Sequence, residues 1–286
     1  KLEQIAYDAI TETQAESMIM IAADCKTGEI LSYISLPSAD LNDYGMASNE
    51  AKLNRPSTNA YEPGSVFKIF TVGIVTDEKG ISANDSFLCD GAYEKRLGNG
   101  ETVRIKCLEH HGWLTPREAL KYSCNDVLGQ ISDRISDDQF INRIKQLGFG
   151  EKTGIELSGE TPGFVKDPDN KTWSARSKPT IAIGQEISVS ALQMVQAATA
   201  IANGGVPVKL RVISKITDKE GNTVYEAAPE ERERAFRKGT ADYILSCMET
   251  TATTGTGSRA NIGDVAIGVK TGTAQMADKE NGGYSD

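Results

Sequence analysis

A serine and a lysine lie one helical turn apart in EPGSVFKIFTVGIV, the apolar stretch from Glu62 to Val75. Ser65 follows Gly64 at the predicted start of a helix, where backbone N–H groups and the helix dipole favour negative charge. Lys68 is three residues further along and therefore on the same face of the helix. The pair has the residue types and the spacing for nucleophilic catalysis by serine.

The surroundings of the lysine decide whether it is suited to act as a base. Phe67, Ile69 and Phe70 flank Lys68, and burial among them disfavours the ammonium form and lowers the pKa. A neutral lysine beside a serine hydroxyl is a general base beside a nucleophile. The alternative is a lysine whose charged end reaches out of a partly buried helix into solvent.

Two further short patterns occur more than once in the chain. Ser-x-x-Lys occurs only at Ser65, whereas Ser-x-Asn occurs more than once, among other places at residues 82–84 and 123–125. Lys-Thr-Gly occurs at residues 26–28, 152–154 and 270–272. Serine β-lactamases and penicillin-binding proteins carry these three patterns in this order.

Longer stretches around the motifs resemble the penicillin-binding transpeptidases of the serine β-lactamase superfamily, most closely the class B, monofunctional kind. The resemblance extends over nearly the whole chain. The stretches that carry it are DCKTGEILSYISLPSADLN, NRPSTNAYEPGSVFKIFT, HHGWLTPREALKYSCNDV, LGFGEKTGIEL, AIGQEISVSALQMVQAATAIANGG and VAIGVKTGTAQ.

The resemblance implies a peptidoglycan D,D-transpeptidase that works through a serine acyl-enzyme. Ser65 would attack the penultimate D-alanine carbonyl of a stem peptide, and Lys68 would take its proton. Ser123 would relay a proton, and Asn125 would hold a substrate amide. The backbone N–H groups of Ser65 and Thr273 would form the oxyanion hole. For Ser123 and Asn125 the alternative is a turn at a helix end, which both residue types favour.

The third Lys-Thr-Gly copy is the one expected in the site, because a β-rich run, residues 265–269, leads into it. Lys270 would supply positive charge, while Thr271 and Thr273 would contact the substrate carboxylate. The small residue Gly272 would let an extended stem peptide approach the strand. The resemblance also implies covalent inhibition by β-lactam antibiotics and no cofactor.

Other hydrolase classes fit the sequence less well. A Ser-His-Asp triad needs a histidine, but the chain has only His110 and His111 and no G-x-S-x-G motif. A class A β-lactamase needs a deacylating glutamate after the Ser-x-Asn motif, and the EAKLN at residues 50–54 precedes Ser65. A D,D-carboxypeptidase and a β-lactam-sensing signalling domain remain as alternatives.

The cysteines offer a disulfide or a metal site. Cys89 and Cys107 flank Gly98-Asn99-Gly100 nearly symmetrically, which predicts a disulfide that closes a small hairpin. Two reduced thiols are the alternative. A metal site that combines these cysteines with His110 or His111 is a further alternative, because the ligand types are present without a standard spacing.

Composition limits the partners. The 286 residues carry a formal charge of −9 with no block of basic residues, which argues against nucleic acid or an anionic membrane surface as partner. No apolar run approaches the roughly 18–20 residues of a membrane span. The resemblance implies an extracytoplasmic domain, in the periplasm or at the outer face of the cytoplasmic membrane. It also implies an N-terminal membrane anchor and a C-terminal continuation that this chain lacks, and partners in the cell-wall synthesis machinery.

The elements that must position these residues alternate along the chain. Predicted strands have short apolar or β-branched runs between turn residues, and predicted helices have the helical period or a capping residue. Strands are expected at 18–23 and 30–36, as a small hairpin within 89–112, within 206–224 and at 265–269. Helices are expected from Ser65, from Thr115, at 188–202 and at 240–251, with a loop at 40–64.

Strands at both ends of a helical middle predict an α+β fold, in which helices flank an antiparallel sheet. The helical part, residues 65–184, is expected as an insertion into a sheet-containing part, residues 1–64 and 185–286. We expect residues 1–286 to form one transpeptidase domain.

Overall fold

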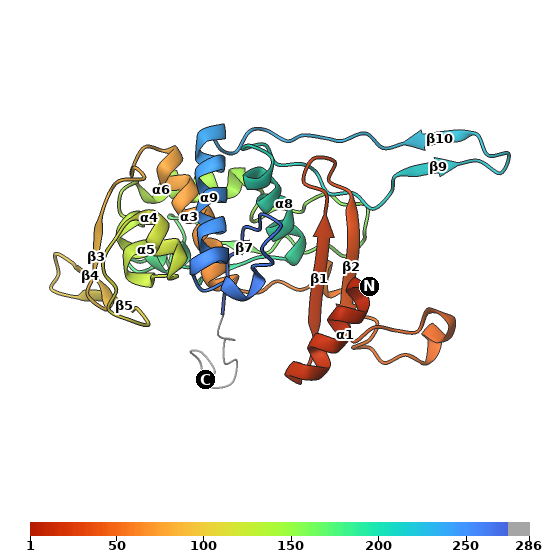
Figure 1. Ribbon diagram of the computed structural model, residues 1–286, viewed down its shortest axis with the longest axis horizontal. Coiled ribbons are helices and arrows are strands. Elements are labelled where there is room, and N and C mark those ends of the chain that lie inside the picture. The colour runs from red at the N-terminus through yellow and green to blue at the C-terminus, as the bar shows by residue number, and fades with distance from the viewer. Residues whose placement is uncertain (274–286) are drawn as a thin grey trace.

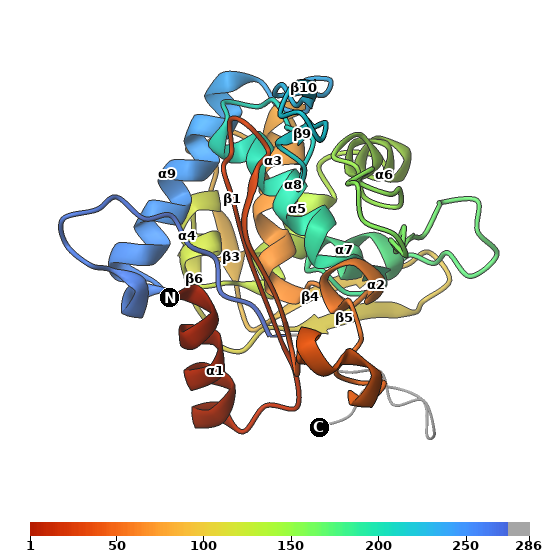
Figure 2. The same cartoon turned by 90° about the vertical axis from the view of Figure 1, so that its right-hand side faces the viewer.

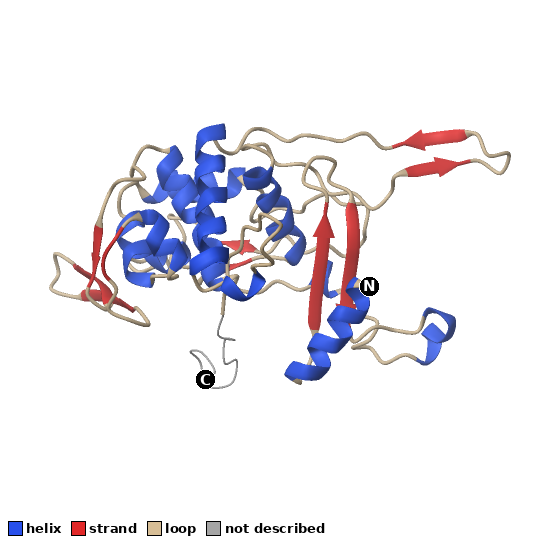
Figure 3. Cartoon of the chain, viewed as in Figure 1, coloured by secondary structure: helices blue, strands red, loops and turns tan. Residues whose placement is uncertain are grey.

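A computed structural model describes residues 1–273, in which packed helices form a central body with paired strands around it (Figure 1, Figure 3). The helices are α1 Leu2–Thr13, α2 Arg55–Thr58, α3 Lys68–Asp77, α4 Pro116–Lys121, α5 Asn125–Ser132, α6 Asp137–Gln146, α7 Ser177–Ala182, α8 Ala191–Ala202 and α9 Lys238–Thr254, with 3₁₀ turns η1 Leu41–Met46, η2 Gly64–Phe67 and η3 Ser258–Ala260. The strands are β1 Met18–Ala23, β2 Ile30–Leu36, β3 Phe87–Cys89, β4 Ala92–Arg96, β5 Thr102–Lys106, β6 Gly112–Leu114, β7 Phe164–Val165, β8 Ile187–Ser188, β9 Lys215–Thr217 and β10 Thr223–Glu226. The predicted α+β class is confirmed.

The hairpin of β1 and β2 stands beside the helical body, with α1 at its lower end (Figure 1, Figure 2). Its register pairs Met18 with Leu36, and both strands have the predicted bounds. Ala6 of α1 packs into a small core with Ile34 and Leu36. The β9–β10 hairpin projects away from the body on the same side (Figure 1).

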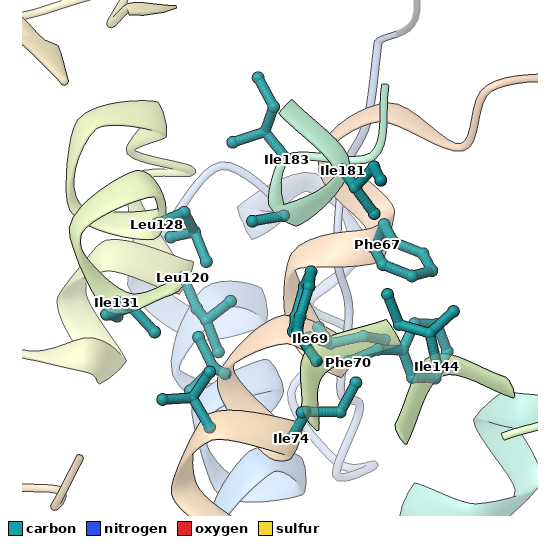
Figure 4. Close-up of a cluster of buried hydrophobic side chains, with 14 of the residues drawn as sticks. Phe67, Ile69, Phe70, Ile74, Leu120, Leu128, Ile131, Ile144, Ile181 and Ile183 are labelled. Carbon is teal, nitrogen blue, oxygen red and sulfur yellow. The ribbon is translucent and has the colours of Figure 1, made fainter. Parts of the chain in front are cut away.

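Helix α3 runs through the main hydrophobic core (Figure 4). A helix that is apolar on every side is stable only when other elements cover it, and Phe67 to Val75 are all buried here. The rings of Phe67, Phe70 and Phe149 pack with centroids 5.2–5.6 Å apart. This packing fixes the first turn of α3, which carries Lys68.

The small hairpin around Gly98-Asn99-Gly100 is confirmed as β4 paired with β5. Strand β3 pairs instead with β6, which leads into α4. The predicted helix start at Thr115 is also confirmed, because the Thr115 and Glu118 side chains form a reciprocal capping box there.

The expected strand at residues 265–269 is wrong for the part of the chain that the structure describes. The strands in residues 1–273 form two-stranded antiparallel pairs, and none of them includes this run. Its backbone is held by a helix instead, because the N–H of Val269 donates to the carbonyl of Met248 in α9 at 3.1 Å. A β-rich run becomes a strand only beside a partner strand. The expected loop at 40–64 also differs, because it contains the short turns η1, α2 and the start of η2.

The predicted disulfide between Cys89 and Cys107 is wrong for this structure, in which both are free cysteines. Cys89 ends β3 and pairs with Gly112, whereas Cys107 follows β5 and its N–H donates to Gly91. Cys89 thus lies in the β3–β6 pair and Cys107 just after β5, so they do not close one hairpin, although their sulfurs lie within 4.8 Å of each other. The division of the chain into 65–184 and its two flanks stays a prediction.

Candidate active site

Ser65 lies in the 3₁₀ turn η2, which continues directly into α3. A 3₁₀ turn has three residues per turn, so side chains at i and i+3 lie above one another. Ser65 and Lys68 consequently share a face, and the Lys68 N–H donates to the Ser65 carbonyl. The Ser65 side chain is partly buried, at the surface of the core that covers its lysine neighbour.

Lys68 is fully buried, with no exposed surface. Burial, and to a smaller extent the nearby charge of Lys270, lower the pKa of Lys68 to about 7. Its Nζ donates to the Ser123 carbonyl at 2.6 Å and to Asn125 Oδ1 at 2.6 Å. A neutral amine has two N–H groups for these two acceptors, and its lone pair remains for a third partner such as the Ser123 hydroxyl 3.3 Å away.

Ser123 connects the two lysines of the site. Its Oγ lies 3.3 Å from Lys68 Nζ and 2.9 Å from Lys270 Nζ, although Lys270 is 147 residues further along the chain. Ser123 lies between α4 and α5, and its backbone has the left-handed conformation, with φ 57°. A non-glycine residue in this conformation is uncommon, and such conformations persist where the surroundings enforce them.

Asn125 is the first residue of α5 and is held at both ends of its amide. Oδ1 accepts from Lys68 Nζ, and Nδ2 donates to the carbonyl of Lys106 at 3.0 Å. In this structure the Asn125 amide positions the lysine. The contact with a substrate amide that the resemblance implied stays a prediction.

The Lys270–Thr273 segment passes close to the serine. A Cβ added to Gly272 would lie 2.5 Å from Val66 Cγ2 and 3.1 Å from the Val66 backbone nitrogen, so only glycine fits there without movement. Val66 follows Ser65 directly. Thr271 Oγ1 hydrogen-bonds Thr256 Oγ1 at 2.8 Å, and Thr271, Gly272 and Thr273 are exposed. Burial lowers the pKa of Lys270 to about 8.

The other motif copies lie elsewhere. Lys26 belongs to the turn between β1 and β2, where Gly28 has φ 71° and a Cβ would lie 1.9 Å from the Lys209 carbonyl oxygen. Thr153 of the second copy is buried, and its N–H donates to the Glu160 carboxylate at 2.6 Å. Ser82 caps a turn by hydrogen bonds to Asp85. Each of these copies has a local structural use.

One residue that supports the site was missed by sequence reasoning. Gly184 has φ 85°, and a Cβ there would lie 2.0 Å from the carbonyl oxygen of Gly64. The N–H of Gly64 donates to the Gly184 carbonyl at 2.9 Å. The contact fixes the backbone just before Ser65. The only sequence signal was the glycine itself in AIGQE, which does not reveal a partner 120 residues away.

The alternative metal set needs one correction. Cys89, Cys107 and His111 do lie together, but the fourth group beside them is Cys124, and His110 is exposed. The ring of His110 fills the space that the missing side chain of Gly91 leaves.

Within residues 1–273, no helix is both long and apolar enough to cross a bilayer.

Comparison with known proteins finds relatives of this chain among the penicillin-binding proteins. The family model described as "Penicillin binding protein transpeptidase domain" matches residues 18–286. Stage V sporulation protein D of Bacillus subtilis is 31% identical over 281 residues, which cover 96% of this chain and 42% of that protein. Penicillin-binding protein PbpB of Mycobacterium tuberculosis is 28% identical and is covered over 42% of its length.

The solved structures agree. The crystal structure of penicillin binding protein 3 from Mycobacterium tuberculosis, complexed with aztreonam, superposes with a TM-score of 0.88 at 27% identity, over 100% of this chain and 64% of that one. The apo transpeptidase domain of penicillin-binding protein 3 from Burkholderia pseudomallei gives a TM-score of 0.81 at 24% identity and shares the fold. The chain spans less than half the length of the curated relatives named above.

Proposed function

This chain belongs to the penicillin-binding protein transpeptidase domain family, and on that basis we propose that it catalyses D,D-transpeptidation of peptidoglycan stem peptides. One observation carries the proposal. A fully buried lysine, Lys68, lies one 3₁₀ turn after Ser65 and shares the Ser123 hydroxyl with Lys270. Such a constellation contains a nucleophile, a base of lowered pKa, a relay and a cation within one cluster.

The first half of the reaction forms the acyl-enzyme. Lys68 Nζ takes the proton of Ser65 Oγ as that oxygen attacks the carbonyl of the penultimate D-alanine. The backbone N–H groups of Ser65 and Thr273 receive the developing oxyanion. The proton then reaches the leaving D-alanine nitrogen through the Ser123 hydroxyl, and Lys270 with Thr271 holds the substrate carboxylate.

The second half transfers the acyl group. An amine of a neighbouring stem peptide loses its proton to Lys68 and attacks the Ser65 ester to form the cross-link. The ester C–O bond breaks, and Lys68 returns the proton to Ser65 Oγ, which regenerates the serine. A β-lactam presents a similar carbonyl and carboxylate, and its opened ring remains on Ser65. The finer setting is also a proposal: an extracytoplasmic domain of a membrane-anchored protein that works with the cell-wall synthesis machinery.

Labelling with a fluorescent penicillin, followed by mass spectrometry of the labelled peptide, tests the nucleophile. We expect the label on Ser65, its loss in Ser65→Ala, and normal labelling in the matched control Ser82→Ala. Because the change is a small one at a partly buried side chain, the stability should shift by no more than about 1 kcal/mol. Undiminished labelling of Ser65→Ala would contradict the mechanism.

A second measurement separates transpeptidase from carboxypeptidase and sensor. A stem pentapeptide ending in D-Ala-D-Ala is incubated with and without an amine acceptor. We expect an acceptor-dependent cross-linked product. Release of D-alanine with water alone as acceptor would indicate a carboxypeptidase, and stable acylation by penicillin without turnover of the peptide would indicate a sensor.

A further inference from the structure

Four metal-ligand side chains meet directly behind the Ser123–Asn125 turn. The ligand atoms of Cys89, Cys107, His111 and Cys124 all lie within 4.8 Å of one another. They come from three parts of the chain: the end of β3, the two ends of the loop between β5 and β6, and the N-cap of α5. Chance contact between two cysteines is common in a core, but convergence of four such groups from three segments (Cys107 and His111 share the loop between β5 and β6) is not explained by packing alone.

Three distances between ligand atoms of this cluster are close to those of a tetrahedral zinc site. Corners of a tetrahedron with zinc–sulfur bonds of about 2.3 Å and a zinc–nitrogen bond of about 2.1 Å lie roughly 3.5–3.8 Å apart. The Sγ atoms of Cys107 and Cys124 are 3.6 Å apart. His111 Nδ1 lies 3.4 Å from Cys89 Sγ and 3.7 Å from Cys107 Sγ.

The residues around the cluster favour metal binding by these side chains. His111 directs Nδ1 toward the sulfurs, and its other nitrogen, Nε2, lies 4.0 Å from the Glu109 carboxylate. A carboxylate is one of the common outer partners of a zinc-bound histidine, and 4.0 Å puts Glu109 near that position but beyond hydrogen-bond distance. The ring of His111 also stacks on Tyr122, and the N–H of Val127 donates to Cys124 Sγ at 3.4 Å. Only a tenth of the His111 side chain is exposed.

From this cluster we propose that Cys89, Cys107, His111 and Cys124 bind one zinc ion in a closed, structural site. Three thiolates and one imidazole in a tetrahedron are typical of zinc among divalent ions. All four positions are filled by protein, so the ion has no open position for substrate. A disulfide between two of the cysteines is the rival, and it would leave the other thiol and the imidazole without a shared use.

The site would hold the turn that carries Ser123 and Asn125. Cys124 stands between these two residues, and Cys107 follows Lys106, whose carbonyl accepts from Asn125 Nδ2. The zinc would thus clamp the left-handed backbone of Ser123, and with it the acceptors of Lys68. The zinc site stands independently of the proposed function, whereas this coupling to acylation rests on it.

Metal analysis of the purified chain tests the site. We expect one zinc per chain, near-complete loss in His111→Ala and Cys124→Ser, and full retention in the matched controls His110→Ala and Cys25→Ser. Binding should release the thiol protons, so the zinc affinity should rise with pH. If a cluster variant fails to fold, cobalt exchanged into the unaltered chain should give the visible d–d and thiolate charge-transfer bands of tetrahedral coordination.

The outcomes separate the two proposals. A metal-free chain after growth with added zinc, or a disulfide among these cysteines in peptide maps made without reductant, would overturn the site. Removal of zinc from the unaltered chain by a chelator should lower the melting temperature and slow penicillin acylation at least tenfold, with recovery on adding zinc back. Bound zinc whose removal leaves acylation unchanged would overturn the coupling. A chain that binds zinc but never acylates would overturn the proposed function and leave the site standing.

Discussion

The first turn of α3 and the 265–273 segment each bring a lysine to the same hydroxyl, but they hold it in different ways. Lys68 is fully buried, and helix packing and two short hydrogen bonds fix its amine. Lys270 is only partly buried, on a segment that no described strand pairs with. The segment is fastened at single points, such as the Val269 N–H on α9 and the Thr271 hydroxyl.

The difference in burial decides which of the two amines, Lys68 or Lys270, holds a shared proton. Burial lowers the pKa of Lys68 to about 7 and that of Lys270 to about 8, and the charge on Lys270 contributes to the shift of Lys68. When the pair holds one proton, the proton therefore favours Lys270. In the proposed mechanism the buried amine serves as base and the more accessible one as cation, so the rigid region should tolerate change least.

Replacement of Lys68, the proposed base, should have the largest effect on acylation. Lys68→Ala should slow penicillin acylation by about 10²–10⁴-fold, the usual contribution of a positioned general base. Lys178→Ala is the matched control, because Lys178 is also buried but bonds to Ile135 and Asp137 away from the site. Stopped-flow acylation kinetics measure both. A normal rate for Lys68→Ala would point to another base.

The pH dependence should reveal the shared proton. The second-order acylation rate should rise with pH as Lys68 loses its proton near pH 7, and fall above about pH 8 as Lys270 loses its charge. Two pH units below the first pKa, the neutral fraction of Lys68 falls to about one hundredth, and the rate should fall with it. The two apparent values belong to the coupled pair. A rate that stays flat from pH 5 to 9, measured with a non-titrating β-lactam, would contradict this division.

Acylation should be less sensitive to changes in the 265–273 segment than to changes in α3. Lys270→Ala should cut acylation by at least about tenfold, as for the loss of one preorganised electrostatic contact. Lys26→Ala and Lys152→Ala carry the same change in the other two Lys-Thr-Gly copies and should leave the rate nearly unchanged. A damaging Lys152→Ala together with a silent Lys270→Ala would reverse the assignment.

Local patterns were predicted well from the sequence. Ser65 and Lys68 lie within one turn, so their shared face follows from helix geometry alone. The β1–β2 hairpin and the Thr115 cap follow in the same way from nearby residues. The meeting of Ser123 with Lys270 was expected only from the family resemblance, because nothing local joins residues so far apart.

Contacts between distant elements were where sequence reasoning failed. The middle residue of Ser-Cys-Asn, Cys124, was treated as a spacer, although its sulfur turns away from the site to join Cys107 and His111. Near-symmetry about a turn predicted a disulfide from Cys89 to Cys107, but strand pairing put them on different hairpins. Side-chain direction across separate elements depends on tertiary packing, which spacing along the chain does not encode.

The smallest effect on acylation should come from removing one hydrogen bond that holds the 265–273 segment. Thr256→Val removes the 2.8 Å hydrogen bond to Thr271 Oγ1, and both threonines are exposed. A hydrogen bond of this kind contributes about 1 kcal/mol net, so acylation should slow by no more than roughly fivefold. Thr253→Val is the control, because its hydroxyl bonds only within α9. A loss above tenfold in Thr256→Val would mean that the segment is held as tightly as α3, and the contrast between the two regions would fail.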